Sequence, residues 1–221
     1  MPGTLYVVAT PIGNLEDVTL RALRILKTVD AIACEDTRTT IKLLSHHDIR
    51  RPLVAYYGKS GEGLLDRLRR GESIALVSEC GTPGLSDPGR ELVAAAHDTG
   101  IPVRAIPGPS ALAAAASVSG LPADELVFAG FLPRKPGKRR KALLALAAEE
   151  KTLVFYESPH RVAAMLEDML AALGDRPLVI AREITKIHEE ATRTTVARAA
   201  ERFRSEEPRG EFVLVVAGVT S

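Results

Sequence analysis

Charged side chains gather directly after three of the predicted strands. They occupy Glu35–Arg38 (EDTR), Glu157–Arg161 (ESPHR), and the two short runs Arg182-Glu183 and Lys186–Glu190. Ligands of open parallel sheets bind beyond the carboxyl ends of the strands. Carboxylates placed there are candidate general bases, and the cations are candidate groups for holding negative charge. Taken singly, each cluster is also typical of a helix cap or a surface ion pair, and Asp36 could simply cap the helix that follows it.

Three other loops after predicted strands combine glycine with proline. They are Thr10–Asn14 (TPIGN), Glu79–Gly89 (ECGTPGLSDPG) and Pro107–Ser110 (PGPS). Glycine lets a backbone approach a ligand closely, and proline fixes a turn without donating a hydrogen bond. Each loop alone is also typical of a tight turn. Three of them at one edge of a sheet favour a cofactor site.

Two of these loops are predicted to open helices. Asp87 is a candidate N-cap with Pro88 at the first helical position, and Gly108 with Pro109 repeats that pattern. Free amides at a helix N-terminus suit a carboxylate or another anion. The usual phosphate-binding patterns are absent, because Gly58-Lys59-Ser60 has Leu53 where a P-loop needs glycine, and no Gly-x-Gly-x-x-Gly follows the first strand. The sequence thus argues against an NTPase and against a dinucleotide-dependent dehydrogenase.

One dense basic run, Arg134–Lys141 (RKPGKRRK), lies in the second half of the chain. A solvated helix start explains such a run. However, cations at a helix N-terminus oppose the helix dipole, so the run is also a candidate contact to a nucleic-acid backbone.

Composition narrows the class of protein. The 221 residues are 46% hydrophobic and 26% charged, which suits two α/β domains. The net charge of +1 gives no global attraction to nucleic acid or membrane, so such binding needs a local patch. Aromatic residues make up only 4% of the chain and tryptophan is absent, which argues against an RNA surface of stacked aromatics. We expect reduced thiols at Cys34 and Cys80, a cytoplasmic location, no metal site and no membrane segment.

The pattern of apolar runs predicts an α/β fold in two domains, 1–119 and 120–221, with the boundary at Gly120-Leu121-Pro122. In the first domain, strands alternate with helices, which implies a mainly parallel sheet. The strands expected there are Thr4–Ala9, Ala31–Cys34, Leu53–Tyr57, Ser73–Ser78 and Ile101–Ile106. The helices expected there are Thr19–Lys27, Asp36–Leu44, Gly63–Arg70, Pro88–His97 and Pro109–Val118. On the first of these helices, Leu20, Leu23 and Leu26 are expected to share one face.

The second domain has fewer helices between strands, so we expect a mixed sheet. Its predicted strands are Leu126–Phe131, Thr152–Tyr156, Leu178–Arg182 and Glu211–Ala217. Its predicted helices are Lys141–Glu150, His160–Leu173 and Thr195–Ser205. The helix His160–Leu173 is strongly amphipathic, and its methionines are expected to pack in the core.

Several motifs in a fixed order carry a resemblance to a known family. They include TPIGN, ACEDTRTT, GTPGLSDPG, IPGPSALAAA, FLPRK, FYESPHR, AREITKIHEE and GEFVLVVAG, between about Gly3 and Gly218. In these motifs the chain resembles the ribosomal RNA small-subunit methyltransferase I family, within the tetrapyrrole methylase superfamily. The resemblance implies two α/β domains with S-adenosylmethionine (SAM) in the cleft between them, usually in a homodimer. It also implies 2'-O-methylation of a cytidine ribose in the decoding region of 16S rRNA, in the small ribosomal subunit.

The resemblance also assigns roles by position. The residues expected to line the SAM site are Pro11, Gly13, Gly81, Thr82, Pro83, Ser110, Ala111, Tyr156 and Glu211. The placement of charges at strand ends, and not the resemblance, makes Asp36 or Glu157 the expected base for the ribose hydroxyl, with Arg38 and Lys186 positioning phosphates or stabilising charge. The expected RNA contacts are Arg134, Lys135, Lys138, Arg139 and Arg161.

The chain departs from the family pattern in two places. Ser78-Glu79-Cys80-Gly81 stands where the family usually has Ser-Asp-Ala-Gly, and Tyr57–Glu62 lacks the usual His-Asn-Glu cluster. Two alternative functions therefore stay open. One is a SAM-dependent methylase of a tetrapyrrole or another small molecule, and the other is a non-catalytic RNA-binding or ribosome assembly factor.

Overall fold

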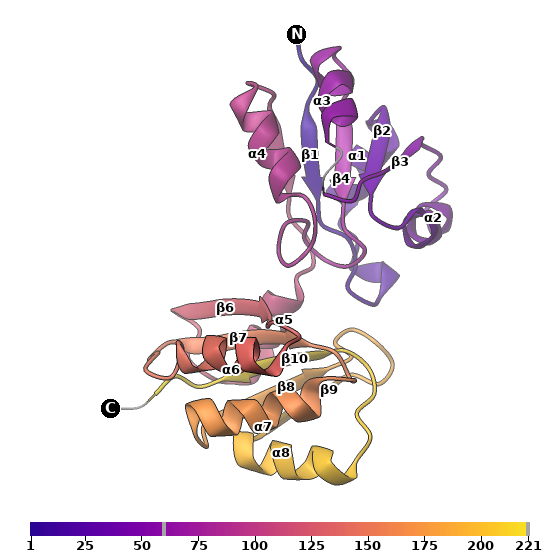
Figure 1. The fold of residues 1–221 in the computed structure, drawn as a ribbon. Helices are drawn as coiled ribbons and strands as arrows, with labels where there is room; N and C mark the ends of the chain where they lie inside the picture. The colour runs from indigo at the N-terminus through magenta and orange to yellow at the C-terminus, as the bar shows by residue number, and fades with distance from the viewer. Residues whose placement is uncertain (59–60, 220–221) are drawn as a thin grey trace. The chain divides into compact units, whose positions relative to one another are not determined.

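The computed structural model describes residues 1–58 and 61–219, and it divides into two compact units (Figure 1). The first unit is Met1–Ser110 and the second is Ala111–Ser221. The division falls before helix α5 (Ala111–Ser119), whereas the sequence placed the boundary after it, at 119/120. The reason is packing, because Ala115 of α5 is buried against Val154, Val179 and Val215 of the second unit's sheet.

The first unit is built on a parallel sheet, as predicted. Its strand order is β3-β2-β4-β1-β5, and each neighbouring pair is parallel. The strands are β1 (Leu5–Val8), β2 (Ala31–Cys34), β3 (Leu53–Ala55), β4 (Ile74–Val77) and β5 (Val103–Ile106). The helices are η1 (Leu15–Asp17), α1 (Leu20–Thr28), α2 (Thr37–His46), α3 (Glu62–Arg69) and α4 (Arg90–Asp98). This order places β1 between β4 and β5, so the loops after those three strands share one edge.

Helices cover both faces of this sheet. Leu26 of α1 and Leu44 of α2 pack with Val8 and Ile32 on one face. Leu68 of α3 and Leu92 of α4 pack with other strand residues on the opposite face. Because both faces are covered, β2 and β4 are buried along their whole length, which is why their sequences are continuous apolar runs.

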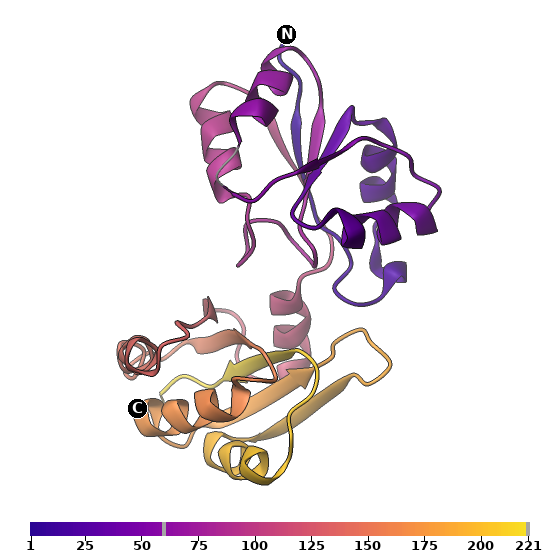
Figure 2. The same cartoon turned by 45° about the vertical axis from the view of Figure 1, so that its right-hand side comes forward.

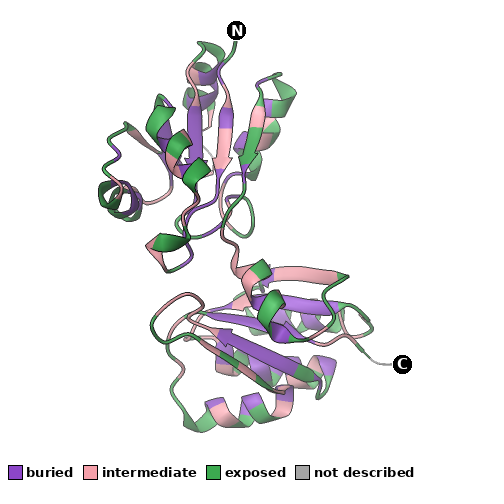
Figure 3. Cartoon of the chain, turned by 180° about the vertical axis from the view of Figure 1, so that it is seen from behind, coloured by how far each residue is buried: buried purple, intermediate pink, exposed green. Residues whose placement is uncertain are grey.

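The second unit has the mixed sheet that the sequence predicts. Its order is β6-β7-β10-β8-β9, in which only β6 and β7 are parallel neighbours. The strands are β6 (Leu126–Phe131), β7 (Thr152–Glu157), β8 (Pro177–Arg182), β9 (Glu190–Thr195) and β10 (Phe212–Val216). The middle strands β7, β10 and β8 are buried, whereas β6 and β9 at the edges are partly exposed (Figure 3).

Three helices cover one face of the second sheet. They are α6 (Pro136–Leu144), α7 (Val162–Leu173) and α8 (Val196–Ser205), and they share a core with strand residues such as Phe155 and Leu214. Met165 and Met169 of α7 are fully buried in that core, as expected. Helix α5 lies on the opposite face of the sheet from α7 and α8 (Figure 2).

Some details of the elements differ from the sequence prediction. Leu20 is 86% exposed instead of facing the core with Leu26, because it stands at the first position of α1. Helix α6 begins at Pro136 and not at Lys141, so the basic run lies mainly inside the helix. Strand β9 was not predicted, because Glu190–Thr195 (EATRTT) is a polar edge strand without the apolar run that marks the others.

Candidate functional site

The three glycine- and proline-rich loops of the first unit meet at one edge of its sheet. The backbone N–H of Thr10 donates to the Gly81 carbonyl at 2.8 Å, and the Gly81 N–H donates back to the Thr10 carbonyl at 3.1 Å. The Thr82 hydroxyl donates to the Pro109 carbonyl at 3.2 Å, which joins the second loop to the third. The structure therefore brings together the first-unit residues that the sequence assigned to a cofactor, namely Pro11, Gly13, Gly81, Thr82, Pro83 and Ser110.

Glycine is required where these loops cross. Gly81 has a φ of +79°, and a Cβ placed there would lie 3.2 Å from Ile12. A Cβ at Gly108 would lie 3.0 Å from the Cβ of Ala9. At Gly84, whose φ is +84°, a Cβ would meet nothing within 4 Å, so this part of the loop faces open space.

Asp36 acts as the N-cap of α2, which is the structural alternative that the sequence allowed. Its Oδ1 accepts from the Arg38 N–H at 2.7 Å, and its Oδ2 accepts from the Arg38 guanidinium at 3.1 Å. These bonds to Arg38 lower the pKa of Asp36. A carboxylate that is already bonded and weakly basic is a poor proton acceptor. Arg38 itself is 88% exposed.

Asp87 is a candidate base that its sequence pattern does not reveal. The pattern predicts Asp87 as the N-cap of the next helix, but α4 begins at Arg90 and its N-cap is Gly89, with a φ of 140°. Burial raises the pKa of Asp87 to about 6, and the negative charges of Glu35 and Glu79 act in the same direction. One signal in the sequence points to this helix start. Gly89, directly after Pro88, is itself a residue type found at N-caps, and a cap there places the start of the helix beyond Asp87.

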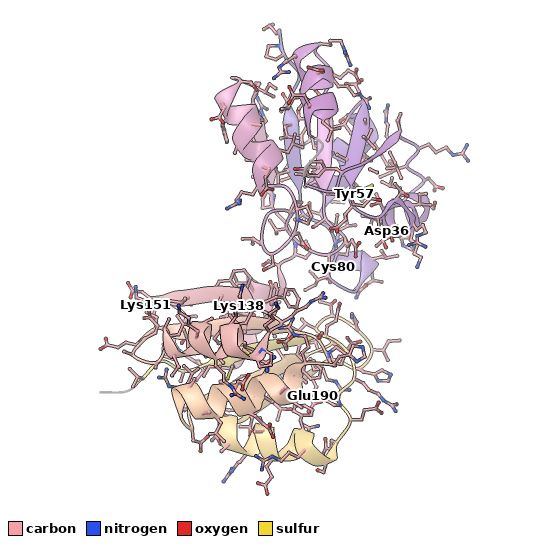
Figure 4. The ribbon with its side chains drawn as sticks, in the orientation of Figure 1. Asp36, Tyr57, Cys80, Lys138, Lys151 and Glu190 are labelled. Carbon is pink, nitrogen blue, oxygen red and sulfur yellow. The ribbon has the colours of Figure 1, made fainter. Side chains whose placement is uncertain are left out.

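The polar side chains that follow β2, β3 and β4 lie at the end of the first unit where the loops converge. Asp36 after β2, Tyr57 after β3 and Cys80 after β4 are seen together at that end in Figure 4. Tyr57 is 68% exposed and Cys80 is also exposed. Lys59 and Ser60, which belong to the segment that departs from the family pattern, lie outside the described residues.

In the second unit, Tyr156 and the start of α5 form a compact corner. The Tyr156 hydroxyl oxygen accepts a hydrogen bond from the Leu112 N–H at 2.9 Å, in the first turn of α5. The Tyr156 ring packs edge-to-face against Phe128 and Phe131, at centroid distances of 4.9 and 5.6 Å. Two residues predicted to bind the cofactor, Ala111 and Tyr156, are thus brought together.

Tyr156→Phe tests how much the hydrogen bond in this corner stabilises the protein. The variant keeps the ring contacts but leaves the Leu112 N–H without its acceptor, so we expect the free energy of unfolding to fall by about 1–2 kcal/mol. Urea denaturation followed by circular dichroism measures the change. An unchanged midpoint would mean that water replaces the lost acceptor.

Glu157, one of the two predicted bases, is a buried residue at the end of β7. Its side chain is 0% exposed and forms an ion pair with Arg161 at 3.2 Å. Its Oε1 accepts from the Ser158 N–H at 2.8 Å. Arg161 also donates to the Leu132 carbonyl at 2.7 Å, and its side chain is 21% exposed. These bonds hold the loop after β7.

Lys186 lies between two carboxylates. Its Nζ is 2.9 Å from Glu183 Oε1 and 2.7 Å from Glu211 Oε2, which joins the end of β8 to the start of β10. Although burial works against it, bonding to Glu211 and Glu183 raises the pKa of Lys186. Glu183 and Thr185 have φ values of 50° and 71°, so this turn is conformationally strained. The structure thus groups two predicted site residues, Lys186 and Glu211.

The basic run separates into one buried cation and several exposed ones. Arg139 is 5% exposed, and its Nε donates to Asp168 at 2.7 Å. The guanidinium of Arg139, a predicted RNA contact, is thus paired with a carboxylate inside the unit. Arg140 also bonds Asp168, although its side chain stays 64% exposed. The remaining exposed cations form no ion pair within the described part of the chain; they are Arg134, Lys135, Lys138 and Lys141.

Among residues 1–58 and 61–219, no group of three or more histidine, cysteine, aspartate or glutamate side chains is placed to hold a metal ion. No helix in the same ranges is long and apolar enough to span a membrane. No disulfide joins Cys34 and Cys80.

Comparison with known proteins finds similarity over nearly the whole chain. The family model for tetrapyrrole (corrin/porphyrin) methylases matches residues 4–200. Ribosomal RNA small subunit methyltransferase I of Synechocystis sp. is 51% identical over 223 residues, covering 99% of this chain and 80% of that protein. The protein of that name from Thermotoga maritima is 45% identical over 221 residues, covering 98% of this chain and 99% of that one.

Solved structures show the same fold. The methyltransferase CobJ superimposes with a TM-score of 0.73 at 19% identity, covering 99% of this chain and 95% of that one. Diphthine synthase superimposes with a TM-score of 0.72 at 15% identity, covering 98% and 90%. The chain therefore belongs to the ribosomal RNA small subunit methyltransferase I family of tetrapyrrole methylases.

Proposed function

We propose that this protein is a SAM-dependent methyltransferase of 16S rRNA that modifies the 2'-hydroxyl of a cytidine in the decoding region. The observation that carries the proposal is the 51% identity, over nearly the whole chain, to a protein named for methylation of small-subunit ribosomal RNA. The exposed cations of the basic run support an RNA substrate. We further propose that the protein works as a homodimer in the cytoplasm, on the small ribosomal subunit.

The residues present fit a SAM molecule. This donor carries a carboxylate, an ammonium group and a flat base, which backbone groups and small side chains can hold. The converged loops supply such a backbone surface, open at Gly84. The residues proposed to hold SAM are Pro11, Gly13, Gly81, Thr82, Pro83, Ser110, Ala111, Tyr156 and Glu211. Bound SAM supplies a methyl group on a sulfonium sulfur.

Asp87 is the proton acceptor that we propose for the ribose hydroxyl. The 2'-hydroxyl becomes a good nucleophile only as its proton leaves, and a base whose pKa lies near neutral pH is best suited to take that proton. Asp87 lies in the same loop as Gly81 and Thr82, and it does not cap α4. Asp36, by contrast, is bonded to Arg38. Arg38 is exposed at the same end of the unit, and its proposed role is to hold a phosphate of the substrate.

The direct test maps the methyl group. Purified protein is incubated with isotopically labelled SAM and small ribosomal subunits that lack the modification, and the rRNA is analysed by mass spectrometry. We expect label on one cytidine ribose in the decoding region. SAM binding without labelled rRNA would favour a small-molecule methylase. Absence of a calorimetric heat with SAM, together with RNA binding, would favour a non-catalytic assembly factor.

A salt titration tests the RNA contacts. Replacing Arg134, Lys135 and Lys138 by alanine should weaken RNA binding and lower the slope of log K against log salt by about 2–3, because each lost phosphate contact removes about 0.7–0.9. Fluorescence anisotropy with a labelled decoding-region RNA measures both quantities, and calorimetry with SAM should show no change. The matched control replaces the exposed Arg21, Arg24 and Lys27 of α1. Equal slopes for both triple variants would refute the assignment.

A further inference from the structure

The edge strand β6 carries an aromatic side chain in an unusual position. Phe131, its last residue, is 54% exposed, whereas Phe128 and Tyr156 beside it are half-buried. In a regular strand, residues 128 and 131 point to opposite faces of the sheet, because side chains alternate. Here both rings contact the same neighbour, Tyr156.

A β-bulge produces this arrangement. The register of β6 against β7 shifts between Phe128 and Gly130, and Gly130 has a φ of +56°. A bulge of this kind changes the direction in which the following side chains point. The result is an aromatic row, Phe128–Tyr156–Phe131, whose last ring is open to solvent.

The ring of Phe131 is supported from behind. Tyr156 packs edge-to-face against it at 5.6 Å, and the Tyr156 hydroxyl is bonded to the Leu112 N–H at 2.9 Å. The chain directly after Phe131 is held as well, because Arg161 donates to the Leu132 carbonyl at 2.7 Å. An exposed ring on a rigid support loses little entropy when a flat ligand stacks on it.

The exposed cations of the basic run follow the ring along the chain. Arg134 lies three residues beyond Phe131, so their Cα atoms are within about 11 Å of each other. Lys135 comes next, and Lys138 projects from α6 (Figure 4). One short segment thus presents an aromatic ring and several exposed positive charges that form no ion pair with the residues the structure describes. That combination is typical of surfaces that bind single-stranded nucleic acid.

We propose that Phe131 is a stacking platform for one unpaired base of the RNA substrate, with the neighbouring phosphates held by Arg134, Lys135 and Lys138. This inference rests on the proposed function and deepens it, because it names how the RNA is recognised. It is compatible with the expectation from composition. Few aromatic residues argue against a surface of several stacked bases, but one correctly placed ring is enough for a single base.

The test compares three substitutions of Phe131 in the full chain. Phe131→Ala and Phe131→Leu should each weaken binding of a fluorescein-labelled 12-nucleotide single-stranded decoding-region RNA by about 5- to 100-fold. Phe131→Tyr keeps a flat ring and should bind within about twofold of the wild type. The matched control is Leu144→Ala, which removes an apolar side chain that is 60% exposed at the end of α6. It should bind RNA like the wild type.

Two further readouts identify what stacks on the ring. RNAs with 2-aminopurine at successive positions should show quenched fluorescence at one position with the wild type and with Phe131→Tyr, but not with Phe131→Ala. Calorimetric affinity for SAM should be unchanged in Phe131→Ala. Lower SAM affinity with unchanged RNA affinity would show that the ring serves the methyl donor and would overturn the proposal, as would wild-type RNA binding by both Phe131→Ala and Phe131→Leu.

The outcome separates this inference from the proposed function. If the wild type methylates small subunits but Phe131→Ala binds RNA normally, only the stacking role fails. If the wild type shows no rRNA methylation while Phe131→Ala still loses RNA affinity and quenching, the stacking role stands and the proposed reaction fails.

Discussion

Asp168→Ala is expected to lower the free energy of unfolding of the second unit by about 3–5 kcal/mol. The Asp168 carboxylate accepts from Arg139 at 2.7 Å and from Arg140 at 2.6 Å, and the side chains of Asp168 and Arg139 are only 5% and 6% exposed. Alanine would leave the Arg139 guanidinium charged in the interior, where its other acceptor among residues 1–58 and 61–219 is the Ala164 carbonyl at 3.4 Å. Arg140 is largely exposed and can turn to water, so the cost arises mainly at Arg139.

Calorimetry or urea denaturation of the full chain measures this effect, and two variants control for it. Glu167→Ala removes the partner of Arg204 on the surface, where the side chains are 52% and 64% exposed, and should change stability by less than about 1 kcal/mol. The double variant Arg139→Met/Asp168→Leu removes both buried charges and should recover most of the loss. A loss below about 1 kcal/mol for Asp168→Ala would show that Arg139 reaches solvent when its partner is removed.

The pH dependence of the same variant has a definite sign. Although burial opposes it, bonding to Arg140 and Arg139 lowers the pKa of Asp168 below its usual 3.8. The stabilisation is therefore fully present above pH 3.8 and is lost as the pH falls through the lowered value. The stability difference between the wild type and Asp168→Ala should stay constant between pH 5 and 7, and shrink only in stronger acid.

Much of the fold follows from local sequence patterns. Strands such as β4 (IALV) and β10 (FVLVV) are continuous apolar runs because both faces of their sheets are covered. Strand β9 does not follow this rule, because its sequence, EATRTT, is polar and partly exposed at the sheet edge. It pairs with β8 along six residues, and no local sequence pattern reveals that pairing. The division of the chain at Ser110 likewise depends on which sheet α5 packs against.

The candidate site was predictable at the level of loops but not at the level of individual charges. The glycine and proline loops meet because β4, β1 and β5 are neighbours, and parallel strands end at one edge. Whether a charge faces solvent depends on its partners. Arg139 could have been separated from Lys138 because it stands four residues before the buried Leu143 and so shares its helix face. The burial of Glu157 against Arg161 had no such signal.

Asp87→Asn is expected to lower the single-turnover rate of rRNA methylation by about 10²–10⁴-fold, because asparagine cannot accept the ribose proton. The same substitution should raise stability at pH 7 by about 1 kcal/mol, after allowance for the partial exposure of the group. Burial, with Glu35 and Glu79 nearby, raises the pKa of Asp87 to about 6, so at neutral pH the folded protein carries a charge in an unfavourable place. A neutral amide removes that charge.

The pH profile links these two effects. A raised pKa means that the folded state binds the proton more tightly than the unfolded chain, so the wild type loses stability as the pH rises from about 3.8 to about 6. The advantage of Asp87→Asn should therefore appear over that interval and vanish below it. The wild-type rate should rise with an inflection near pH 6, and the variant should lack that inflection.

Matched variants separate catalysis from folding at this position. Asp98→Asn, at an exposed position on α4, should change neither rate nor stability. Asp36→Asn and Glu157→Gln test the two carboxylates first predicted as the base. A normal rate for Asp87→Asn with a large loss for Asp36→Asn would transfer the role to Asp36. A variant that is both less active and less stable would indicate that Asp87 supports the loop. A gain in stability combined with a loss of rate is what a carboxylate kept at an energetic cost for its basicity should produce.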